Sequence, residues 1–353
     1  MAIREISLKN YRSLQNTRIS FNSGINLITG ANGAGKTSLL EAIYYVAQGR
    51  SFQTHNLNEI VRHGEKEAIV FARFDGHQCG IRRFNGSNEI RLDNKNVNRL
   101  SDLIQKNPIR VLDSKTYQLA VSKPSDRREF IDWSLFHVEH SFREFWQNYR
   151  STLKQRNQIL KDKRNIELLD YWDVNLVKIS KLLSEKRRLF CERLNRLLLS
   201  DFAALIQDLE IAIEYRVGWD SNMELGEVYK KQRERELRYG YTLYGIQRDT
   251  IKITSKGHSS NSVLSRGQLK RLSIALILAQ VKLVMESTAQ SVIVLIDDLT
   301  SELDSKTVEL IRNKLQNMDI QVFLTDIGNK SIDLGNDQVY SLFHVEHGMI
   351  RPV

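Results

Sequence analysis

The first third of the chain alternates apolar with polar residues over short segments, a pattern that predicts β-strands. These segments cover residues 3–14, 24–29, 67–84 and 88–97. Residues 85–87, Asn-Gly-Ser, separate the last two segments, and such a sequence is typical of a hairpin turn. We expect the strands to form a mixed sheet.

Residues 125–217 lack both glycine and proline, the residues that most often interrupt helices. Leu, Ile, Phe and Trp recur there at intervals of three and four among charged residues, which predicts a helical block. We expect residues 176–202 to present one apolar face, formed by Leu176, Ile179, Leu182, Leu183, Phe190, Leu194 and either Leu197 or Leu198.

Strand-like patterns return after Gly218, at residues 240–245 and 249–254. The helical block therefore interrupts an α/β nucleotide-binding domain, and the two halves of that domain lie at either end of the sequence. We predict an N-terminal half over residues 1–124, a helical lobe over 125–217 and a C-terminal half over 218–353.

The composition favours a polyanionic partner such as nucleic acid. The 353 residues include 52 Lys and Arg against 42 Asp and Glu, a net charge of +10. A generally basic protein without such a partner fits the charge equally well. Cys79 and Cys191 are far apart, so we expect no disulfide or zinc site and a cytoplasmic location. We also expect neither a signal peptide nor a membrane span, because no apolar run approaches the ~20 residues that a span needs.

Residues 30–37 read Gly-Ala-Asn-Gly-Ala-Gly-Lys-Thr and match the P-loop pattern G-x-x-x-x-G-K-[ST]. The strand predicted over 24–29 precedes this loop. A helix carrying Leu39, Leu40, Ile43 and Ala47 follows it and ends at Gly49. In such loops backbone N–H groups surround the phosphates of ATP. We expect Lys36 to reach the β- and γ-phosphates and Thr37 to bind Mg²⁺.

A second part of the site is predicted at residues 291–298, where an apolar run over 292–296 ends in Asp297 and Asp298. A P-loop site needs a carboxylate that holds Mg²⁺, usually at the end of a buried strand. We assign this role to Asp297. Asp298 projects differently and is the candidate that positions or deprotonates the attacking water.

Two further motifs flank this strand. Residues 264–268, Leu-Ser-Arg-Gly-Gln, begin a predicted helix that Ser265 can cap. Residues 301–304 read Ser-Glu-Leu-Asp. Following a P-loop in this order, the two resemble the signature motif and the D-loop of the ATP-binding cassette superfamily. The resemblance implies an α/β P-loop head of that superfamily.

The segment Leu-Lys-Asn-Tyr-Arg-Ser-Leu at 8–14 resembles the start of SMC-type chromosome-maintenance ATPases. Over residues 6 to about 348 the chain resembles the RecF family of bacterial DNA replication and repair proteins. The resemblance rests on the segment at 8–14 together with motifs around residues 30–52, 127–140, 153–161, 264–272 and 295–304. The resemblance implies an SMC-like head with a helical lobe. It also implies ATP-dependent dimerisation on DNA at single-strand gaps, action with RecR and RecO to load RecA, and support of SOS induction.

The same resemblance implies the roles of individual residues. Arg12 would approach the phosphates, and Ser265 and Gly267 would contact the γ-phosphate of ATP bound by a partner subunit. Hydrolysis would be weak and stimulated by DNA, with Lys36, Asp297 and Asp298 as the catalytic residues. The residues of the loop that would bind ATP with Mg²⁺ are Gly30, Ala31, Asn32, Gly33, Ala34, Gly35, Lys36 and Thr37.

Some positions depart from superfamily patterns. Asp298 stands where Glu is frequent, Asp326 stands where transporters carry a histidine, and Gln118 is only a weak candidate for a Q-loop glutamine. Residues 244–249 also depart from the family pattern, which leaves the role of Gln247 open.

Three other functions remain as alternatives: another SMC-like DNA-maintenance ATPase, the ATPase subunit of a transporter, and a small-molecule kinase. The kinase does not explain the motifs at 264–268 and 301–304. The basic run at 185–193 fits either a DNA-contacting surface or a solvated helix face.

Overall fold

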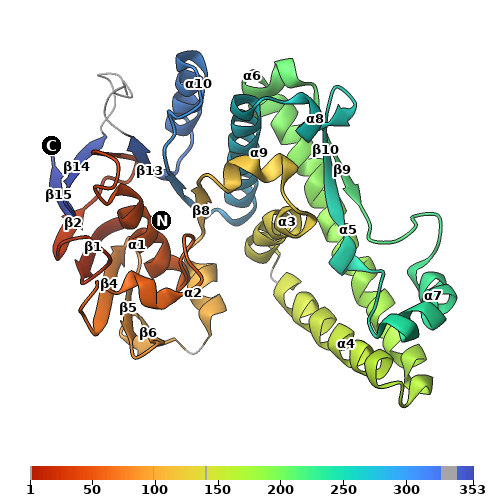
Figure 1. Cartoon of the computed structure of the whole chain (residues 1–353). Coiled ribbons are helices and arrows are strands. Elements are labelled where there is room, and N and C mark those ends of the chain that lie inside the picture. Colours follow the sequence, from red (N-terminus) through yellow and green to blue (C-terminus); the bar gives the residue numbers. More distant parts are fainter. Residues whose placement is uncertain (1, 98, 140, 327–339) are drawn as a thin grey trace. The chain divides into compact units, whose positions relative to one another are not determined.

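The computed structural model describes residues 2–97, 99–139, 141–326 and 340–353 (Figure 1). The chain forms two compact units: Met1–Tyr117 with Lys270–Val353 is unit 1, and Gln118–Leu269 is unit 2. Unit 2 is thus inserted into the sequence of unit 1. The sequence pattern predicts that residues 218–269 belong to the nucleotide-binding domain. In the structure they belong to unit 2, because β9 and β10 pair with each other and α7 packs on α4 and α5.

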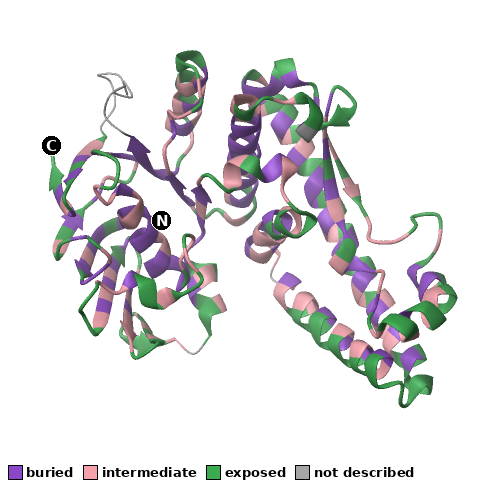
Figure 2. Ribbon diagram, in the orientation of Figure 1, coloured by how far each residue is buried: buried purple, intermediate pink, exposed green. Residues whose placement is uncertain are grey.

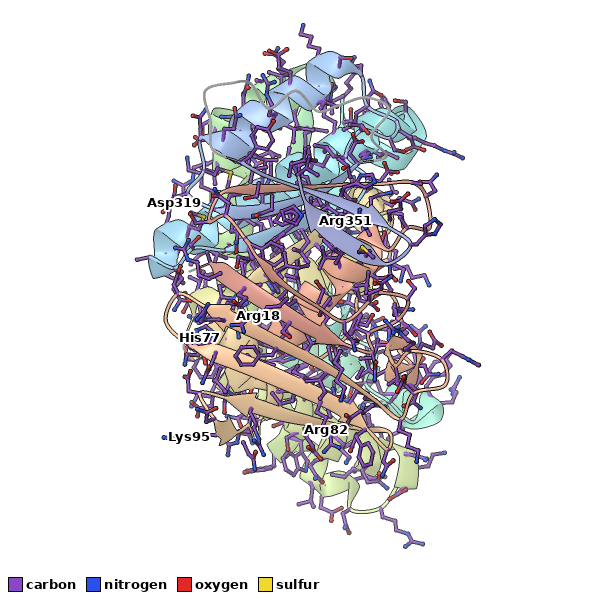
Figure 3. The ribbon with its side chains drawn as sticks, turned by 90° about the vertical axis from the view of Figure 1, so that its left-hand side faces the viewer. Arg18, His77, Arg82, Lys95, Asp319 and Arg351 are labelled. Carbon is purple, nitrogen blue, oxygen red and sulfur yellow. The ribbon has the colours of Figure 1, made fainter. Side chains whose placement is uncertain are left out.

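Unit 1 contains an antiparallel sheet of order β2-β1-β4-β5-β6-β7. Its strands are β1 (Ile3–Lys9), β2 (Thr17–Ser20), β4 (Glu67–Phe74), β5 (Gln78–Phe84), β6 (Ser87–Leu92) and β7 (Lys95–Asn96). The predicted hairpin is confirmed: Asn85 and Gly86 both have positive φ between β5 and β6. Figure 3 shows this sheet with Arg18 and Arg82 on its strands.

The second sheet of unit 1 has the order β15-β14-β3-β13-β12-β8 and is parallel except where β14 meets β15. Its strands are β3 (Ile25–Thr29), β8 (Ile109–Leu112), β12 (Ile293–Ile296), β13 (Gln321–Asp326), β14 (Ser341–Glu346) and β15 (Met349–Pro352). The expectation of a single mixed sheet in the first third is therefore wrong. β3 is buried along nearly its whole length, as central parallel strands are, whereas β4 alternates in burial as a half-exposed antiparallel strand does.

Helix α1 (Lys36–Gln48) packs on the antiparallel strands β4 and β5 and belongs to one apolar core with both sheets (Figure 2). As predicted, Leu39, Leu40, Ile43 and Ala47 are buried and Gly49 caps the helix in a left-handed conformation. The other helices with residues in unit 1 are η1 (Leu57–Ile60), α2 (Leu100–Lys106), η2 (Thr116–Val121), α9 (Arg266–Thr288) and α10 (Ser305–Gln316). Helices η2 and α9 continue across the boundary between the units.

Unit 2 is mainly helical, with a small antiparallel sheet of order β11-β10-β9. Its elements are α3 (Pro124–Val138), α4 (Phe142–Asp162), η3 (Ile166–Leu168), α5 (Leu169–Asp201), α6 (Ala203–Ile206), η4 (Gln207–Leu209), β9 (Ile211–Arg216), α7 (Leu225–Tyr239), η5 (Ile246–Arg248), β10 (Thr250–Ser255), β11 (His258–Ser259) and α8 (Ser260–Val263). On the predicted apolar face of α5, Leu198 rather than Leu197 is buried, and Leu182 is 41% exposed, contrary to expectation.

Two predictions for unit 2 are wrong. Residues 211–216 form strand β9, although they lie in the predicted helical block; β9 pairs with β10, which matches the strand predicted at 249–254. Residues 240–245 are no strand, because side chains take up their backbone N–H groups. Asn157 Oδ1 accepts from Thr242 N at 2.8 Å, and Glu236 Oε1 accepts from Leu243 N at 2.8 Å. In the described residues, no helix is long and apolar enough to cross a membrane.

Candidate nucleotide-binding site

The P-loop joins the end of β3 to the start of α1, as the sequence predicts. Its first and last glycines are required by space and by backbone conformation. Gly30 has φ 150°, and a Cβ there would lie 2.3 Å from the carbonyl oxygen of Val345; Gly35 has φ 115°, and its Cβ would lie 2.7 Å from Leu14 Cδ2. These two glycines let the loop pack closely against Val345 and Leu14 where it leads into the N-terminus of α1, and the N-terminus of a helix favours an anion.

The middle of the loop turns at the surface of unit 1. Asn32 and Gly33 are exposed, and Gly33 has φ 77° with open space where a Cβ would lie, so glycine is needed there for conformation alone. Ala34 is half-buried; its N–H donates to the carbonyl of Ala31 at 3.2 Å, and its own carbonyl accepts from the N–H of Gly348 at 3.0 Å. The N–H of Ala34 thus has a partner within the loop. Binding of ATP by Asn32, Gly33 and Ala34 stays a prediction.

Lys36 is the first residue of α1 and is buried. Its Nζ donates to the carbonyl oxygens of Gly30 at 2.7 Å and Ala31 at 2.9 Å, so the ammonium lies inside the loop. Burial lowers the pKa of Lys36, and the nearby Asp297, Asp298 and Asp326 oppose this shift.

Thr37 and Asp297 meet although 260 residues separate them. Thr37 Oγ1 lies 3.1 and 3.0 Å from the two carboxylate oxygens of Asp297, which directly follows β12. Because β3, β13 and β12 are parallel neighbours, their carboxyl ends share one edge of the sheet. Burial raises the pKa of Asp297, and hydrogen bonds from Thr325 and Thr37 act in the opposite direction.

Thr325, which the sequence analysis did not select, connects the two aspartates. Its Oγ1 donates to Asp297 Oδ1 at 2.7 Å and accepts from the backbone N–H of Asp298 at 2.9 Å. The available signal was its position at the end of a buried strand next to β12. Asp298 itself has φ 55°, and its buried Oδ1 has no hydrogen-bond partner among the described residues.

Arg12 has a protein partner in this structure. Its Nε and Nη2 both bind the buried carboxylate of Glu41 on α1, with Nη2 to Oε1 at 2.7 Å. Ser51 Oγ donates to the same carboxylate. The predicted approach of Arg12 to the phosphates would therefore compete with this buried ion pair.

A cleft of about 670 Å³ lies beside the start of α1. Arg12 and Ser38, the residue that follows Thr37, line it together with Arg62 and His63. The loop residues 32–34 are not part of this lining.

Ser265 caps α9, as predicted. Its Oγ accepts from the backbone N–H of Gln268 at 3.3 Å, and Gln268 Oε1 accepts from the N–H of Ser265 at 2.9 Å, which is a reciprocal capping box. Ser265 is exposed. Gly267, which has no side chain, lies in the first turn of α9. Both belong to unit 2, whereas the P-loop belongs to unit 1.

The remaining sequence candidates have structural roles or an exposed position. Asp326 is buried and accepts from Thr300 Oγ1 at 2.7 Å. Gln247 accepts from the hydroxyl of Tyr149 and donates to the carbonyl of Tyr244 at 3.0 Å, so it stabilises unit 2. Gln118 lies in η2, where its backbone departs from helical geometry.

The basic run at 185–193 is largely neutralised within unit 2. Arg188 pairs with Glu185 and Glu192 on the same helix at 2.6 and 2.5 Å, and Arg187 is buried against Asp132 at 2.9 Å. This pairing favours the solvated, structural interpretation.

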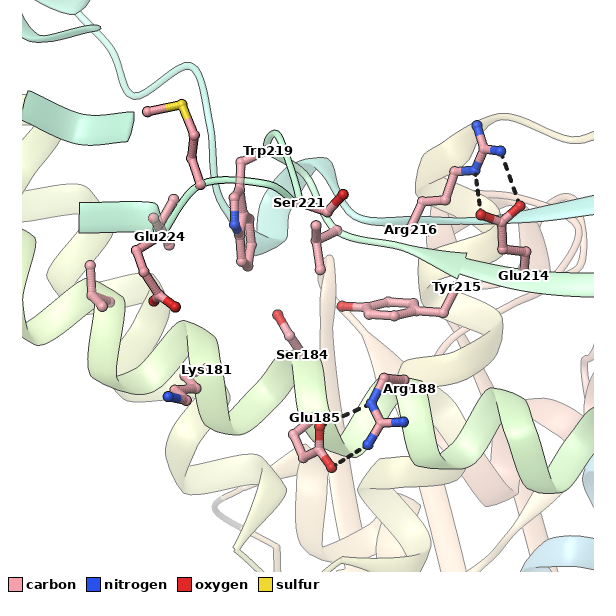
Figure 4. Close-up of a pocket in the computed structure, with 14 residues that line it drawn as sticks. Lys181, Ser184, Glu185, Arg188, Glu214, Tyr215, Arg216, Trp219, Ser221 and Glu224 are labelled. Atoms are coloured by element: carbon pink, nitrogen blue, oxygen red, sulfur yellow. Dashed lines mark hydrogen bonds and ion pairs between the residues drawn. The ribbon is translucent and has the colours of Figure 1, made fainter. Parts of the chain in front are cut away.

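Unit 2 has a separate cavity of about 670 Å³ between α5, β9 and the start of α7 (Figure 4). Trp219 and Tyr215 contribute aromatic surface to it. Four of its charged residues pair locally, Glu185 with Arg188 and Arg216 with Glu214 at 3.0 Å. This cavity contains none of the predicted site residues.

The family model for the RecF/RecN/SMC N terminal domain matches residues 2–351. DNA replication and repair protein RecF of Shewanella sp. (strain MR-7) is 35% identical over 359 aligned positions, covering 100% of both chains, and the RecF of Shewanella oneidensis is 34% identical over the same length. The chain belongs to the RecF/RecN/SMC N-terminal domain family, and its full-length similarity to RecF proteins places it in the RecF branch. The resemblance found in the sequence is thereby confirmed.

Solved structures agree with the predicted α/β, SMC-like fold class. A structure of the recombination mediator protein RecF with ATP, in the RecFOR pathway, matches with a TM-score of 0.85 at 24% identity, covering 100% of this chain and 97% of the other. An Smc head bound to the C-terminal winged-helix domain of ScpA matches with a TM-score of 0.63 at 14% identity, with coverage of 100% and 97%. At these identities the likeness concerns the fold.

Proposed function

We propose that this protein is a DNA-binding ATPase of recombinational repair and replication that acts in the cytoplasm. The observation that carries the proposal is the approach of Thr37 Oγ1 to both oxygens of Asp297 at 3.0 and 3.1 Å, beside a glycine loop that leads into α1. The RecF relatives, named as DNA replication and repair proteins, and the net charge of +10 support the DNA-binding part.

The residues present fit Mg²⁺ and ATP. Oxygen ligands from one carboxylate and one hydroxyl suit Mg²⁺, which keeps several waters and binds the phosphates of its nucleotide. Thr37 and Asp297 would hold the ion, and Gly30 to Thr37 would bind the triphosphate. When bound, Mg²⁺ neutralises charge on the phosphates. The cleft beside Ser38 is the proposed place for the nucleoside, with Arg12 at its border.

Asp298 is the proposed acceptor of a proton from the attacking water. Its Oδ1, which has no partner in the part of the chain that the structure describes, is able to accept a hydrogen bond, and Thr325 holds its backbone N–H. The aspartate side chain is shorter than the glutamate found in many related ATPases, and we infer from this that hydrolysis is slow. We also propose that DNA stimulates hydrolysis.

Two chains would complete each other around ATP. Ser265 and Gly267 at the N-terminus of α9 present a hydroxyl and backbone N–H groups, which suit the γ-phosphate held by a partner subunit. ADP lacks that phosphate, so hydrolysis would release the dimer. We place this ATP-controlled dimer at single-strand gaps in DNA, where it would act with RecR and RecO in loading RecA and support SOS induction.

The test compares DNA retention by the unchanged protein and by Lys36→Ala, with and without ATP, at several salt concentrations. The variant removes the charge-assisted contacts to the phosphates and should lose ATP-dependent retention while its melting temperature stays close to that of the parent. ATP-dependent retention by a folded Lys36→Ala protein equal to that of the parent would refute the site.

A further inference from the structure

The chain leaves unit 1 after Tyr117 and returns to it at Lys270, and both residues bind the segment that follows β12. The Tyr117 hydroxyl donates to the carbonyl oxygen of Asp297 at 2.8 Å. Lys270 Nζ donates to the carbonyl oxygens of Asp298 at 2.8 Å and Ser301 at 2.6 Å. Tyr117 and Lys270, at which the chain leaves and re-enters unit 1, thus hold three backbone carbonyls of residues 297–301.

The two side chains also contact each other. Lys270 Nζ lies 4.3 Å from the centroid of the Tyr117 ring, and Ser273 Oγ, one turn further along α9, donates to the Tyr117 carbonyl at 3.0 Å. Lys270 is only 2% exposed, and burial lowers its pKa to about 8. A buried ammonium is costly unless its donors are satisfied, which the two carbonyls and the ring accomplish.

The segment needs such support. Asp298 and Glu302 both have positive φ, 55° and 61°, which is unfavourable for residues with a Cβ. Among the described residues, one carboxylate oxygen of Asp298 has no hydrogen-bond partner, so the backbone contacts of this residue are important for fixing its position. On one side of this residue Thr325 holds the N–H, and on the other Lys270 holds the carbonyl.

We propose that Lys270 and Tyr117 are positioning residues for ATP hydrolysis. They fix the backbone that carries Asp298 and link it to the two points where the chain enters and leaves unit 2. Lys270 lies five residues after Ser265, and α9 begins between them, so the same helix connects the predicted γ-phosphate contact to this backbone. The inference rests on the proposed function, because it assumes that Asp298 acts on the attacking water.

The alternative is that both residues only stabilise the fold. Three variants separate the two cases: Lys270→Met, Lys270→Arg and Tyr117→Phe, which removes only a hydroxyl. Lys282→Met is the matched control, because Lys282 lies on the same helix and faces Glu286 at 3.9 Å. For each, one measures thermal unfolding, the Kd of a fluorescent ATP analogue, and the rate of single-turnover ATP hydrolysis.

Displacement of a catalytic group by a fraction of an ångström already lowers rates strongly, so we expect Lys270→Met to slow hydrolysis about 30-fold and Tyr117→Phe about fivefold. The Kd should change less than about twofold, because both side chains bind backbone carbonyls of residues 297–301 and neither the P-loop nor the carboxylate of Asp297. Lys270→Arg should recover most of the rate, since a guanidinium can donate to both carbonyls. The double variant should lose less than the product of the single effects, because the residues act on one backbone segment.

Hydrolysis at the parental rate in both Lys270→Met and Tyr117→Phe would overturn the inference. So would a loss of rate that follows the loss of thermal stability, with Lys282→Met equally affected. Failure of the proposed function has a different signature. In that case Asp298→Asn would hydrolyse ATP as fast as the parent, or the parent would not hydrolyse ATP at all.

Discussion

Replacing Arg156 by methionine should destabilise unit 2 selectively. Arg156 is fully buried and lies at the centre of a polar cluster. Its Nε donates to Asp173 at 2.6 Å, its Nη2 lies 2.7 Å from Glu236, and its Nη1 donates to Thr242 at 2.7 Å. The guanidinium also lies 4.4 Å from the centroid of the Tyr229 ring. Methionine fills a similar volume without any of these donors.

The loss of stability depends on which partners Asp173 and Glu236 keep when Arg156 is replaced. Asp173 keeps Arg233 at 2.8 Å. Among the residues that the structure describes, the side chain of Glu236, which is 0% exposed, keeps only the backbone N–H of Leu243. Breaking a buried pair by removing one partner costs about 3–5 kcal/mol, because the remaining charge is uncompensated. We therefore expect Arg156→Met to lower the free energy of unfolding of unit 2 by about 4 kcal/mol.

The stability of the Arg156→Met variant should also depend on pH. In the unchanged protein, burial raises the pKa of Glu236 above its ordinary 4.5, and the charge of Arg156 opposes this shift. Without Arg156 the pKa in the folded state rises further, so the folded variant binds a proton that the unfolded chain releases. Stability then falls as pH rises from 4.5 through the folded-state pKa, and the deficit should be smaller at about pH 5 than at about pH 8.

Tryptophan fluorescence during urea unfolding measures this effect, because all four tryptophans, at positions 133, 146, 172 and 219, lie in unit 2. The double variant Arg156→Met with Glu236→Gln is the control and should recover about half of the loss. A deficit under about 1 kcal/mol, or one that grows as the pH falls, would refute the reasoning.

Three other predictions concern the site in unit 1. Asp297→Asn should weaken Mg²⁺-dependent nucleotide binding, whereas Asp298→Asn should bind Mg²⁺ and ATP normally and hydrolyse slowly; equal behaviour in both assays would contradict this division. Thr325→Val keeps the shape of the side chain but removes its hydrogen bonds to both aspartates, so single-turnover hydrolysis should fall about tenfold at an unchanged melting temperature. Arg12→Ala should lower the stability of unit 1 by about 2 kcal/mol in thermal unfolding, since the buried Glu41 would lose its cation and keep the hydroxyl of Ser51. An unchanged melting temperature with weaker ATP binding would instead assign Arg12 to the phosphates.

Patterns that are local in sequence placed the P-loop and its flanking elements correctly. The strand, the loop and the helix occupy one continuous segment. The spacing of apolar residues was sufficient to locate the strand and the helix, and the glycine pattern located the loop between them. The capping of α9 by Ser265 is equally local, because donor and acceptor are three residues apart. Strand β9 could also have been found, since Ile211, Ile213 and Tyr215 alternate with the smaller or charged residues Ala212, Glu214 and Arg216.

Helix α7 and the contacts of residues 297–301 could not be predicted in this way. The buried face of α7 includes Glu236, whose partner Arg156 is 80 positions earlier, so the helix appears polar in the sequence. Tyr117 and Lys270 bind backbone carbonyls, which every residue possesses, and no side-chain pattern marks such acceptors. The partner of Arg12, Glu41, is likewise decided by tertiary packing.

The central claim is that ATP held by Lys36 of one chain joins it to Ser265 of another. Light scattering with mixtures of variants tests this most directly. The parent should be monomeric without nucleotide or with ADP and dimeric with ATP, and Ser265→Arg should bind ATP as a monomer without dimerising, because the bulky cation blocks the facing phosphate. Mixing Ser265→Arg with Lys36→Ala leaves at most one intact composite site and should give a weaker dimer than the parent. Dimerisation of Ser265→Arg with ATP as complete as that of the parent would contradict the account.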